Sequence, residues 1–174
     1  MKREKSLTSN IRLASLKDLG EILEVYEESR KFMAENGNPL QWGLRRYPQE
    51  DVLREDIALG RLFVLERNGR IAGAFVLFTG DEPTYAVIRG GSWPDDKPYM
   101  TVHRLGSRSD EHGVAKETLD FAVKLCREKG LGLRADTHAD NKPVQHILLK
   151  YGFDYCGIIT VTDGTDRFAY QYRF

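Results

Sequence analysis

The sequence predicts a single α/β domain, built on a mixed and mostly antiparallel β-sheet with a central parallel pair of strands and helices on both faces. The 174 residues, 41% hydrophobic and 30% charged, have the size and composition of one globular domain with one core. The Asn68-Gly69 dipeptide between two β-branched runs predicts an antiparallel hairpin. The alternation of strands and helices over residues 99–153 requires a parallel pairing, because a crossover helix returns the chain in the same direction.

The first third of the chain predicts one strand and two helices. Residues 11–14 form a short strand, and Ser15 with Asp18 is the residue pair that caps a helix start. The helix continues to Asn36-Gly37, because apolar residues recur on one face at Leu19, Ile22, Leu23, Tyr26, Ser29 and Met33. A second amphipathic segment opens at Pro48 and stops at Gly60.

The middle of the chain changes to a strand pattern. Residues 62–66 and 71–78 flank Asn68-Gly69, which tolerates the positive φ angles of a type I′ turn. Residues 80–98 are rich in Gly, Pro and Asp but include Tyr85 and Trp93, which indicates an ordered loop. A strand follows over residues 99–105.

The last third alternates between helices and strands. We expect helices over residues 114–129 and 143–151, and strands over 131–137, 153–161 and 167–172, with a turn at Asp163-Gly164. We assign residues 9–174 to the domain and residues 1–8 to an N-terminal extension.

Composition argues against several function classes. The 26 basic and 26 acidic residues cancel, so nucleic acid and membrane surfaces are not expected partners. No stretch has the length of a signal peptide or a membrane span, so we expect a cytoplasmic protein. The two cysteines, Cys126 and Cys156, have neither zinc-site nor redox spacing, so we expect reduced core thiols and no metal.

Several motifs resemble the GNAT acetyltransferases over nearly the whole chain. The family's loop of Gln or Arg, two residues, Gly, one residue and Gly or Ala falls on residues 110–115, and its Asn, with Gly-Phe eleven residues later, falls on Asn141 and Gly152-Phe153. A bacterial group of the family also shares motifs like NGNPLQWG, DEPTY, KPYMTVHRL and YCGII, which stand here at residues 36–43, 81–85, 97–105 and 155–159. The resemblance implies the GNAT fold and N-acetyl transfer from acetyl-CoA to an amine.

The resemblance implies a coenzyme A site around the start of the helix at residue 114. A helix N-terminus offers unpaired amides and a positive dipole end to a diphosphate, and glycine permits close approach. The alternative is a plain helix cap by Ser109 or Asp110. Asp110 and Glu111 would repel a diphosphate unless they point to solvent or pair with Arg108 or Lys116, so we expect weakened binding. The residues expected to contact coenzyme A are Leu105, Gly106, Ser107, His112, Gly113, Val114, Ala115 and Asn141.

Within that set the expected roles differ. Backbone amides at residues 105–107 hold the thioester carbonyl, and Gly106 forms a bulge that admits the pantetheine arm. Asn141 either binds that arm or caps a helix.

His103 is the predicted catalytic residue. It matches a position where the family often has a carboxylate or a water-holding residue, and its imidazole can accept a proton from the amine. By the period of two it shares a strand face with Thr101 and Leu105. The alternative is a histidine that only makes structural hydrogen bonds. With Asp136 and His138 it could in principle form a metal site, but anchoring of the loop before Asn141 explains that pair without a missing ligand.

The family's usual acid, a tyrosine seven residues after the Asn, is replaced by Leu148. Tyr151 shares one helix face with Val144 and Leu148, a pattern typical of side chains that pack into a core. The Cys156 thiol or the Tyr99 hydroxyl could instead give a proton to the sulfur of the leaving thiolate. The thiolate can also take its proton from water.

Loop aromatics and amides predict the acceptor cleft, as residues suited to a small or peptide amine: Asn38, Gln41, Trp42, Tyr85 and Trp93. Trp42 and Trp93 could instead close the core. An exposed last strand suggests a homodimer. Two other functions remain open: a non-catalytic acyl-CoA binding or sensing module, and a domain whose loop binds another nucleotide.

Overall fold

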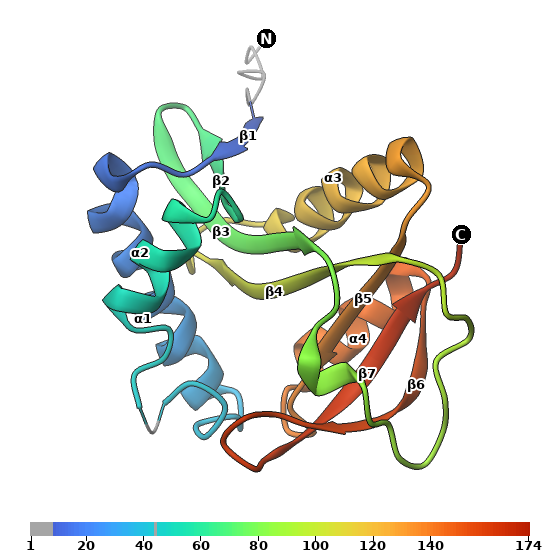
Figure 1. Ribbon diagram of the computed structural model, residues 1–174. Coiled ribbons are helices and arrows are strands. Elements are labelled where there is room, and N and C mark those ends of the chain that lie inside the picture. Colours follow the sequence, from blue (N-terminus) through green and yellow to red (C-terminus); the bar gives the residue numbers. More distant parts are fainter. Residues whose placement is uncertain (1–8, 44) are drawn as a thin grey trace, which may run out of the picture.

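The computed structural model describes residues 9–43 and 45–174, so the predicted extension of residues 1–8 lies outside the described residues. The described residues form one seven-stranded sheet in the order β1-β2-β3-β4-β5-β7-β6 (Figure 1). Every neighbouring pair is antiparallel except β4 and β5. The predicted fold class is therefore confirmed. The strands span Ser9–Leu13, Leu62–Arg67, Arg70–Thr79, Tyr99–Ser107, Gly132–Thr137, Phe153–Thr160 and Asp166–Tyr172, from β1 to β7.

Helices cover both faces of the sheet. The four helices among the described residues are α1 (Leu19–Glu35), α2 (Glu50–Ala58), α3 (Val114–Lys129) and α4 (Lys142–Tyr151). α1 and α2 pack on one face of β2 and β3, where they bury a cluster that includes Ile22, Tyr26 and Leu53. α3 and α4 pack on the other face around Val102, Leu133 and Tyr170. None of the described helices is long and apolar enough to cross a membrane.

The local predictions agree with the structure. Asn68 and Gly69 both have positive φ, 50° and 76°, as the predicted type I′ hairpin requires. The Asp18 carboxylate accepts a hydrogen bond from the Ser15 amide at 2.7 Å, so the predicted capping pair forms at the start of a 3-10 turn that leads into α1. Residues 83–85 form a 3-10 turn within the predicted ordered loop.

The parallel pair is short. Only Tyr99–Thr101 of β4 align with Gly132–Arg134 of β5, and after residue 134 the strand β5 pairs with β7 alone. The carboxyl-terminal halves of β4 and β5 therefore separate, which leaves space in the middle of the sheet (Figure 1).

A β-bulge in β4 changes which side chains face this space. Val76 pairs with His103 and Ala74 with Gly106, so two residues of β4, Arg104 and Leu105, oppose one of β3. Arg104 takes a φ of 51°. The prediction of a bulge at Gly106 is therefore wrong in position: Gly106 stays in the ladder, where an added Cβ would lie 3.0 Å from the Tyr26 ring.

The bulge also overturns the prediction that His103 and Leu105 share a face. Leu105 packs into the cluster below α3 and α4, whereas His103 contacts Phe78 and Tyr85 on the opposite face. One extra residue in a strand reverses the alternation beyond it, and the strict period of two did not allow for that.

Candidate active site

A cavity of about 570 Å³ lies where β4 and β5 separate, and its walls come from both faces of the sheet. The α3 and α4 side is apolar, and its lining residues are Val102, Leu105, Leu119, Ala135, Val144, Ile147 and Leu148. The opposite side is polar, with His103, Arg104, Asp136, His138 and Arg167 from the strands and strand ends, and Gln41, Arg45, Tyr47, Glu82 and Thr84 from loops. The cavity therefore has an apolar half and a polar half, on the two faces of the sheet.

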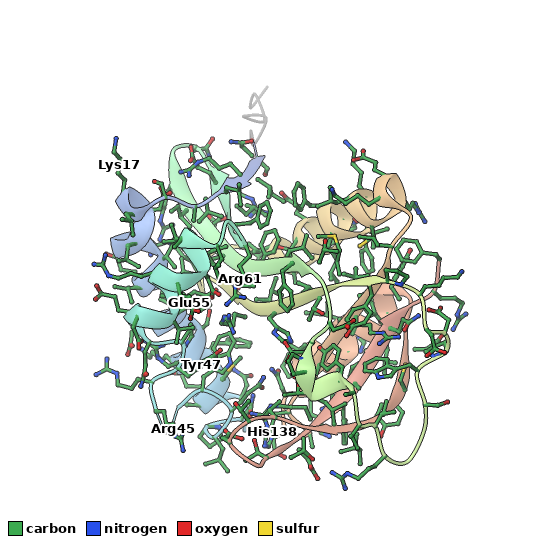
Figure 2. The ribbon with its side chains drawn as sticks, viewed as in Figure 1. Lys17, Arg45, Tyr47, Glu55, Arg61 and His138 are labelled. Atoms are coloured by element: carbon green, nitrogen blue, oxygen red, sulfur yellow. The ribbon has the colours of Figure 1, made fainter. Side chains whose placement is uncertain are left out.

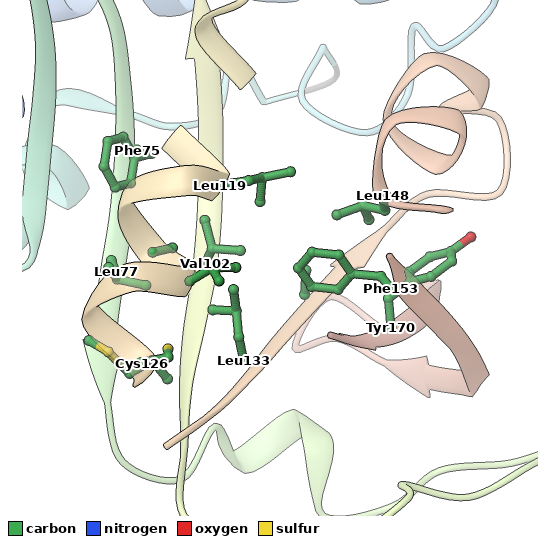
Figure 3. Packing of buried hydrophobic residues seen from close by; sticks show 13 residues of the cluster. Phe75, Leu77, Val102, Leu119, Cys126, Leu133, Leu148, Phe153 and Tyr170 are labelled. Carbon is green, nitrogen blue, oxygen red and sulfur yellow. The ribbon is translucent and has the colours of Figure 1, made fainter. Parts of the chain in front are cut away.

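The apolar half is a slot between two helices. Leu119 of α3 and Leu148 of α4 point toward one another in Figure 3, and both line the cavity. Thr137 lies on the same side, where its Oγ1 atom is buried and has no hydrogen-bond partner in the structure. A buried hydroxyl without a partner is costly, so a ligand with polar groups along an apolar chain would complete this wall.

The polar half contains a hydrogen-bonded cluster centred on one carboxylate. Oδ2 of Asp136 lies 2.9 Å from Nε2 of His103 and accepts a hydrogen bond from the Tyr85 hydroxyl at 2.7 Å. The Tyr85 oxygen is also 3.2 Å from Nε2 of His103. Because Nε2 donates to the carboxylate, Nδ1 is the ring nitrogen left to accept a proton.

Charge and burial keep this cluster in defined protonation states. Burial favours the neutral form of Asp136, but the hydrogen bonds from His103 and Tyr85 outweigh it and hold the pKa of this carboxyl below its usual value. Burial and the neighbouring carboxylate raise the pKa of Tyr85 well above its usual value. Asp136 is thus a carboxylate at neutral pH and Tyr85 a neutral phenol, so together they orient the imidazole.

Arg104, the bulge residue, anchors the wall beside His103. Its guanidinium donates to both oxygens of Asp56, at 2.8 to 3.0 Å, and to the Tyr47 hydroxyl at 2.5 Å. Asp56 is fully buried and also accepts from Arg61 at 2.6 Å. The bulge therefore aims two successive side chains, His103 and Arg104, to the polar side of the sheet.

The loop before α3 neutralises its own carboxylates, but not with the predicted partners. Asp110 pairs with Arg70 at 2.9 Å and Glu111 with Arg67 at 2.7 Å. Arg108 instead binds glutamates of α1, and Lys116 pairs with Asp120. The predicted pairing with Arg108 or Lys116 is therefore wrong. The hairpin arginines, which are far away in the sequence, supply the compensating charge.

The start of α3 leaves its first amides without a side-chain cap. Gly113 is the N-cap residue with a φ of 75°, and neither Ser109 nor Asp110 caps the helix. Val114 is buried below the turn, whereas His112 and Gly113 are exposed and Ala115 is partly exposed. The alternative of a simple cap by Ser109 or Asp110 is thereby excluded. The exposed turn presents backbone donors to an anion.

The amides at residues 105–107 are not equivalent. Ser107 donates its amide to Oγ of Ser29 at 3.0 Å, and Gly106 is paired with Ala74. Leu105 lies in the bulge, has no partner residue in β3 and lines the cavity. Of the three residues predicted to supply amides, Leu105 is the one that both lies in the bulge and lines the cavity.

Asn141 caps α4 at the edge of the cavity. Its Oδ1 accepts from the Val144 amide at 3.4 Å, and its Nδ2 donates to Oε1 of Gln41 at 3.0 Å. Asn38 donates to the same Gln41 oxygen. The capping alternative is therefore observed, and the amide also ties α4 to the segment between α1 and α2.

The structure brings together part of the predicted acceptor set. Gln41 and Trp42 line the cavity, while Asn38 is buried behind Gln41. Tyr85 is buried behind His103, and Trp93 stacks on Tyr85 and donates to its carbonyl oxygen. Trp93 and Tyr85 thus support the polar wall from outside the cavity. Trp42 belongs both to the α1 and α2 core and to the cavity wall.

The hydroxyl and thiol groups considered as acids lie away from the cavity. Tyr151 donates to Asp120 and packs on Phe153 and Tyr172, as the packing stripe predicted. The Tyr99 hydroxyl accepts from the Glu82 amide, and Cys156 is buried in β6. Leu148 itself lines the apolar half. Within residues 9–43 and 45–174, no group of three or more acidic, His or Cys side chains is arranged to hold a metal ion.

Several polar residues of the cavity were not predicted to be part of an acetyl-transfer site, and three of them bear on the arrangement of the site. Asp136 was considered only as a loop anchor or a metal ligand, and its pairing with His103 follows from the parallel alignment of β4 and β5. Arg104 lines the cavity because of the bulge in β4, which no sequence signal marks. Arg167 lines the cavity because β7 lies beside β5; the strand β7 was predicted, but its position in the sheet was not. Figure 2 shows Arg45 and Tyr47 on the segment between α1 and α2, across from His138.

Comparisons with known proteins agree with one another. Residues 22–153 match the sequence model of the acetyltransferase (GNAT) family. A GNAT-family acetyltransferase from Streptococcus agalactiae is 31% identical, with 95% of each chain covered and a TM-score of 0.81. An acetyltransferase structure from Staphylococcus aureus is 28% identical, with 94% of this chain and 97% of that chain covered and a TM-score of 0.71.

A more distant structure holds a ligand. The PaiA N-acetyltransferase of Thermoplasma acidophilum, in complex with coenzyme A, is 20% identical, with 96% of this chain and 99% of that chain covered and a TM-score of 0.65. At this identity the likeness concerns the fold. A search of curated proteins finds no match.

Proposed function

The chain belongs to the GNAT family of acetyltransferases, and we propose that it moves the acetyl group of acetyl-CoA directly to a primary amine of a small molecule or peptide. The observation that carries this proposal is the His103–Asp136 pair on the wall of a cavity that crosses the sheet. A cytoplasmic location, a homodimer and membership of the bacterial group with the motifs described above remain predictions.

The residues present fit acetyl-CoA on the α3 and α4 side. The slot between Leu119 and Leu148 suits the pantetheine arm, and the unpaired Oγ1 of Thr137 would bind one of its amide groups. The uncapped turn at His112 and Gly113 would hold the diphosphate, because the carboxylates beside it are already paired. When bound, acetyl-CoA supplies the activated acetyl group.

The protein's own groups handle the proton and the developing charge. An ammonium ion must lose a proton before its nitrogen can attack, and Nδ1 of His103 would accept that proton while Asp136 stabilises the resulting imidazolium. The Leu105 amide would donate to the acetyl oxygen as it gains negative charge. The amine nitrogen then forms the C–N bond and gives its second proton to water, the C–S bond breaks, and the departing thiolate takes a proton from water.

Two measurements on His103→Ala test this proposal. Coenzyme A release with an amine acceptor should fall by about 100-fold or more, because general base catalysis contributes that much. Calorimetric titration should give an unchanged acetyl-CoA dissociation constant, because the histidine lies on the other side of the sheet. His146→Ala, on the exposed side of α4, is the matched control and should keep full activity.

Two results would count against catalysis by this site. Full turnover by His103→Ala would remove the assigned base. Tight acetyl-CoA binding by the unaltered protein without turnover of any amine would favour the non-catalytic acyl-CoA binding module. The replacement of the family's usual tyrosine by Leu148 is the feature that favours this non-catalytic module.

A further inference from the structure

Arg167 is a buried guanidinium in the polar wall of the cavity. The residue is only 7% exposed and lines the cavity from β7. Within the described part of the chain its hydrogen bonds come from Nη1 alone, to the Thr165 hydroxyl and the Asp166 carbonyl oxygen. No described carboxylate lies within 4.0 Å of it in an ion pair, unlike the buried Arg67, Arg104 and Arg108. A buried charge without a counter-ion is costly, so a ligand is expected to supply one.

The carboxylates nearest in the sequence are already engaged. Asp163 accepts from the amide and hydroxyl of Thr165, at 2.9 and 2.5 Å. Asp166 turns outward to Arg89 at 2.6 Å and to Thr160 at 2.9 Å. Asp136 accepts hydrogen bonds from His103 and Tyr85, and these two residues, together with the charge of Arg167, lower its pKa against the effect of burial. The guanidinium is therefore left facing the cavity.

Strand register places Arg167 on the same side of the sheet as the proposed base. Asp136 pairs with Ala169, so Arg167 is the diagonal neighbour of Asp136 on that face, at about 7 Å between backbone positions. Asp136 in turn contacts His103. A group bound by Arg167 would thus lie within a few bonds of an amine at His103.

A second guanidinium, that of Arg45, lines this end of the cavity together with the imidazole of His138. Arg45 lines it from the segment between α1 and α2 and forms no ion pair with a described residue, while its positive charge helps to lower the pKa of Asp163. Burial and the charge of Arg167 lower the pKa of His138, which therefore stays neutral at neutral pH. Glu82, the remaining acid in this half, accepts from the Thr84 amide and hydroxyl.

We propose that the acceptor is an amino acid, whose carboxylate binds Arg167, with Arg45 at the rim, while its amine faces His103. This inference rests on the proposed function and narrows it to one class of amine. A guanidinium and a carboxylate form two parallel hydrogen bonds, which would satisfy the free N–H groups of Arg167 and fix the amine. Amines without an acidic group would leave the guanidinium unpaired.

The test compares each standard L-amino acid with its carboxamide, by coenzyme A release at saturating acetyl-CoA. The amine of the carboxamide loses its proton more easily than the amine of the amino acid, which by itself would favour the carboxamide. A preference for the amino acid therefore shows that its carboxylate is recognised. For at least one pair, kcat/KM should favour the acid by about 10- to 100-fold, the range for a hydrogen bond to a charged group. Arg167→Gln should remove this preference and leave the amide rate within about threefold, while Arg167→Lys retains part of it.

Arg54→Gln is the matched control, because Arg54 is exposed on α2 and pairs only with Glu50. It should keep the full preference. Circular dichroism of each variant confirms folding, and Arg167→Lys serves if Arg167→Gln does not fold. Equal rates for acids and amides, or an equal loss for both in the Arg167 variants, would overturn the inference.

The test also separates this inference from the proposed function. Acetylation of amines that have no carboxylate, such as spermidine, without acetylation of any amino acid would refute the inference and leave acetyl transfer intact. Failure of the protein to bind acetyl-CoA would refute both.

Discussion

At the residue scale, the site depends on one bulge residue. Arg104 takes a left-handed φ, which directs its guanidinium to the same side as His103, where it neutralises the fully buried Asp56. Arg61 is the other cation on that carboxylate. Removing Arg104 would leave a buried charge half-compensated in the wall beside the proposed base.

We therefore expect Arg104→Met to lower the free energy of unfolding by about 3 kcal/mol, the scale measured when one partner of a buried pair is lost. Urea denaturation at neutral pH measures this difference. Arg54→Met removes an exposed ion pair and should cost less than about 1 kcal/mol. Equal, small effects in both variants would show that Asp56 does not need Arg104.

The capping pair of Ser15 and Asp18 could be predicted from residue identity, and the family resemblance pointed to His103, which lines the cavity, but neither indicated the partners of His103. A contact between two side chains 33 positions apart depends on which strands are neighbours and on their register. The position of Arg104 depends on a bulge, and strand periodicity carries no mark of it. The pairing of Arg67 and Arg70 with the loop before α3 could not be predicted either, because it joins residues that are far apart in the sequence.

At the element scale, the turn before α3 combines an uncapped helix start with two carboxylates. Glu111 is tied to the buried Arg67, whereas Asp110 is exposed and pairs with Arg70 on the surface. The Arg70 guanidinium holds the pKa of Asp110 below its usual value, so this residue is a carboxylate at neutral pH. Asp110, unlike Glu111, can therefore be replaced without disturbing a buried ion pair.

Asp110→Ser should tighten acetyl-CoA binding by about twofold to threefold, because charges that are exposed to solvent interact only weakly. Calorimetric titration at low salt gives the dissociation constant, and the gain should shrink at high salt through screening. Asp81→Ser, an exposed carboxylate in the loop after β3, is the control. An unchanged dissociation constant for Asp110→Ser would show that the loop carboxylates do not oppose the diphosphate.

The start of α1 gives a second prediction at this scale. Hydrogen bonds from Arg12 first, and from Ser15, lower the pKa of Asp18 to about 2 from a usual 3.8. A lowered pKa stabilises the folded state above the usual value, and this contribution is lost as pH falls toward the lower one. Asp18→Asn should therefore cost about 1 kcal/mol at neutral pH.

Urea unfolding at a series of pH values tests this sign. The difference between the unaltered protein and Asp18→Asn should stay constant at neutral pH and begin to shrink below pH 3.8. Asp81→Asn, which removes one exposed carboxylate elsewhere, is the control. A difference that grows on acidification would contradict the assignment.

At the scale of the whole molecule, the fold class followed from the sequence because periodicity and turn residues agree along the chain. The short parallel pair was predicted as a topology, but the separation of β4 and β5 that creates the cavity was not. That separation depends on β7 inserting beside β5 and on the bulge in β4, both long-range features. We propose that residues 9–174 form one domain, which should unfold in a single calorimetric transition that acetyl-CoA shifts to higher temperature.

The central claim is that one cavity through the sheet joins an acetyl-CoA site to an acceptor site, and a crystal structure with acetyl-CoA tests it most directly. We predict the diphosphate at His112 and Gly113, the pantetheine arm between Leu119 and Leu148, and the acetyl oxygen within hydrogen-bond distance of the Leu105 amide, with the His103 side of the cavity open to the amine. Acetyl-CoA bound outside the gap between β4 and β5, or an acetyl group on the side of the sheet away from His103 with no opening between them, would contradict the claim.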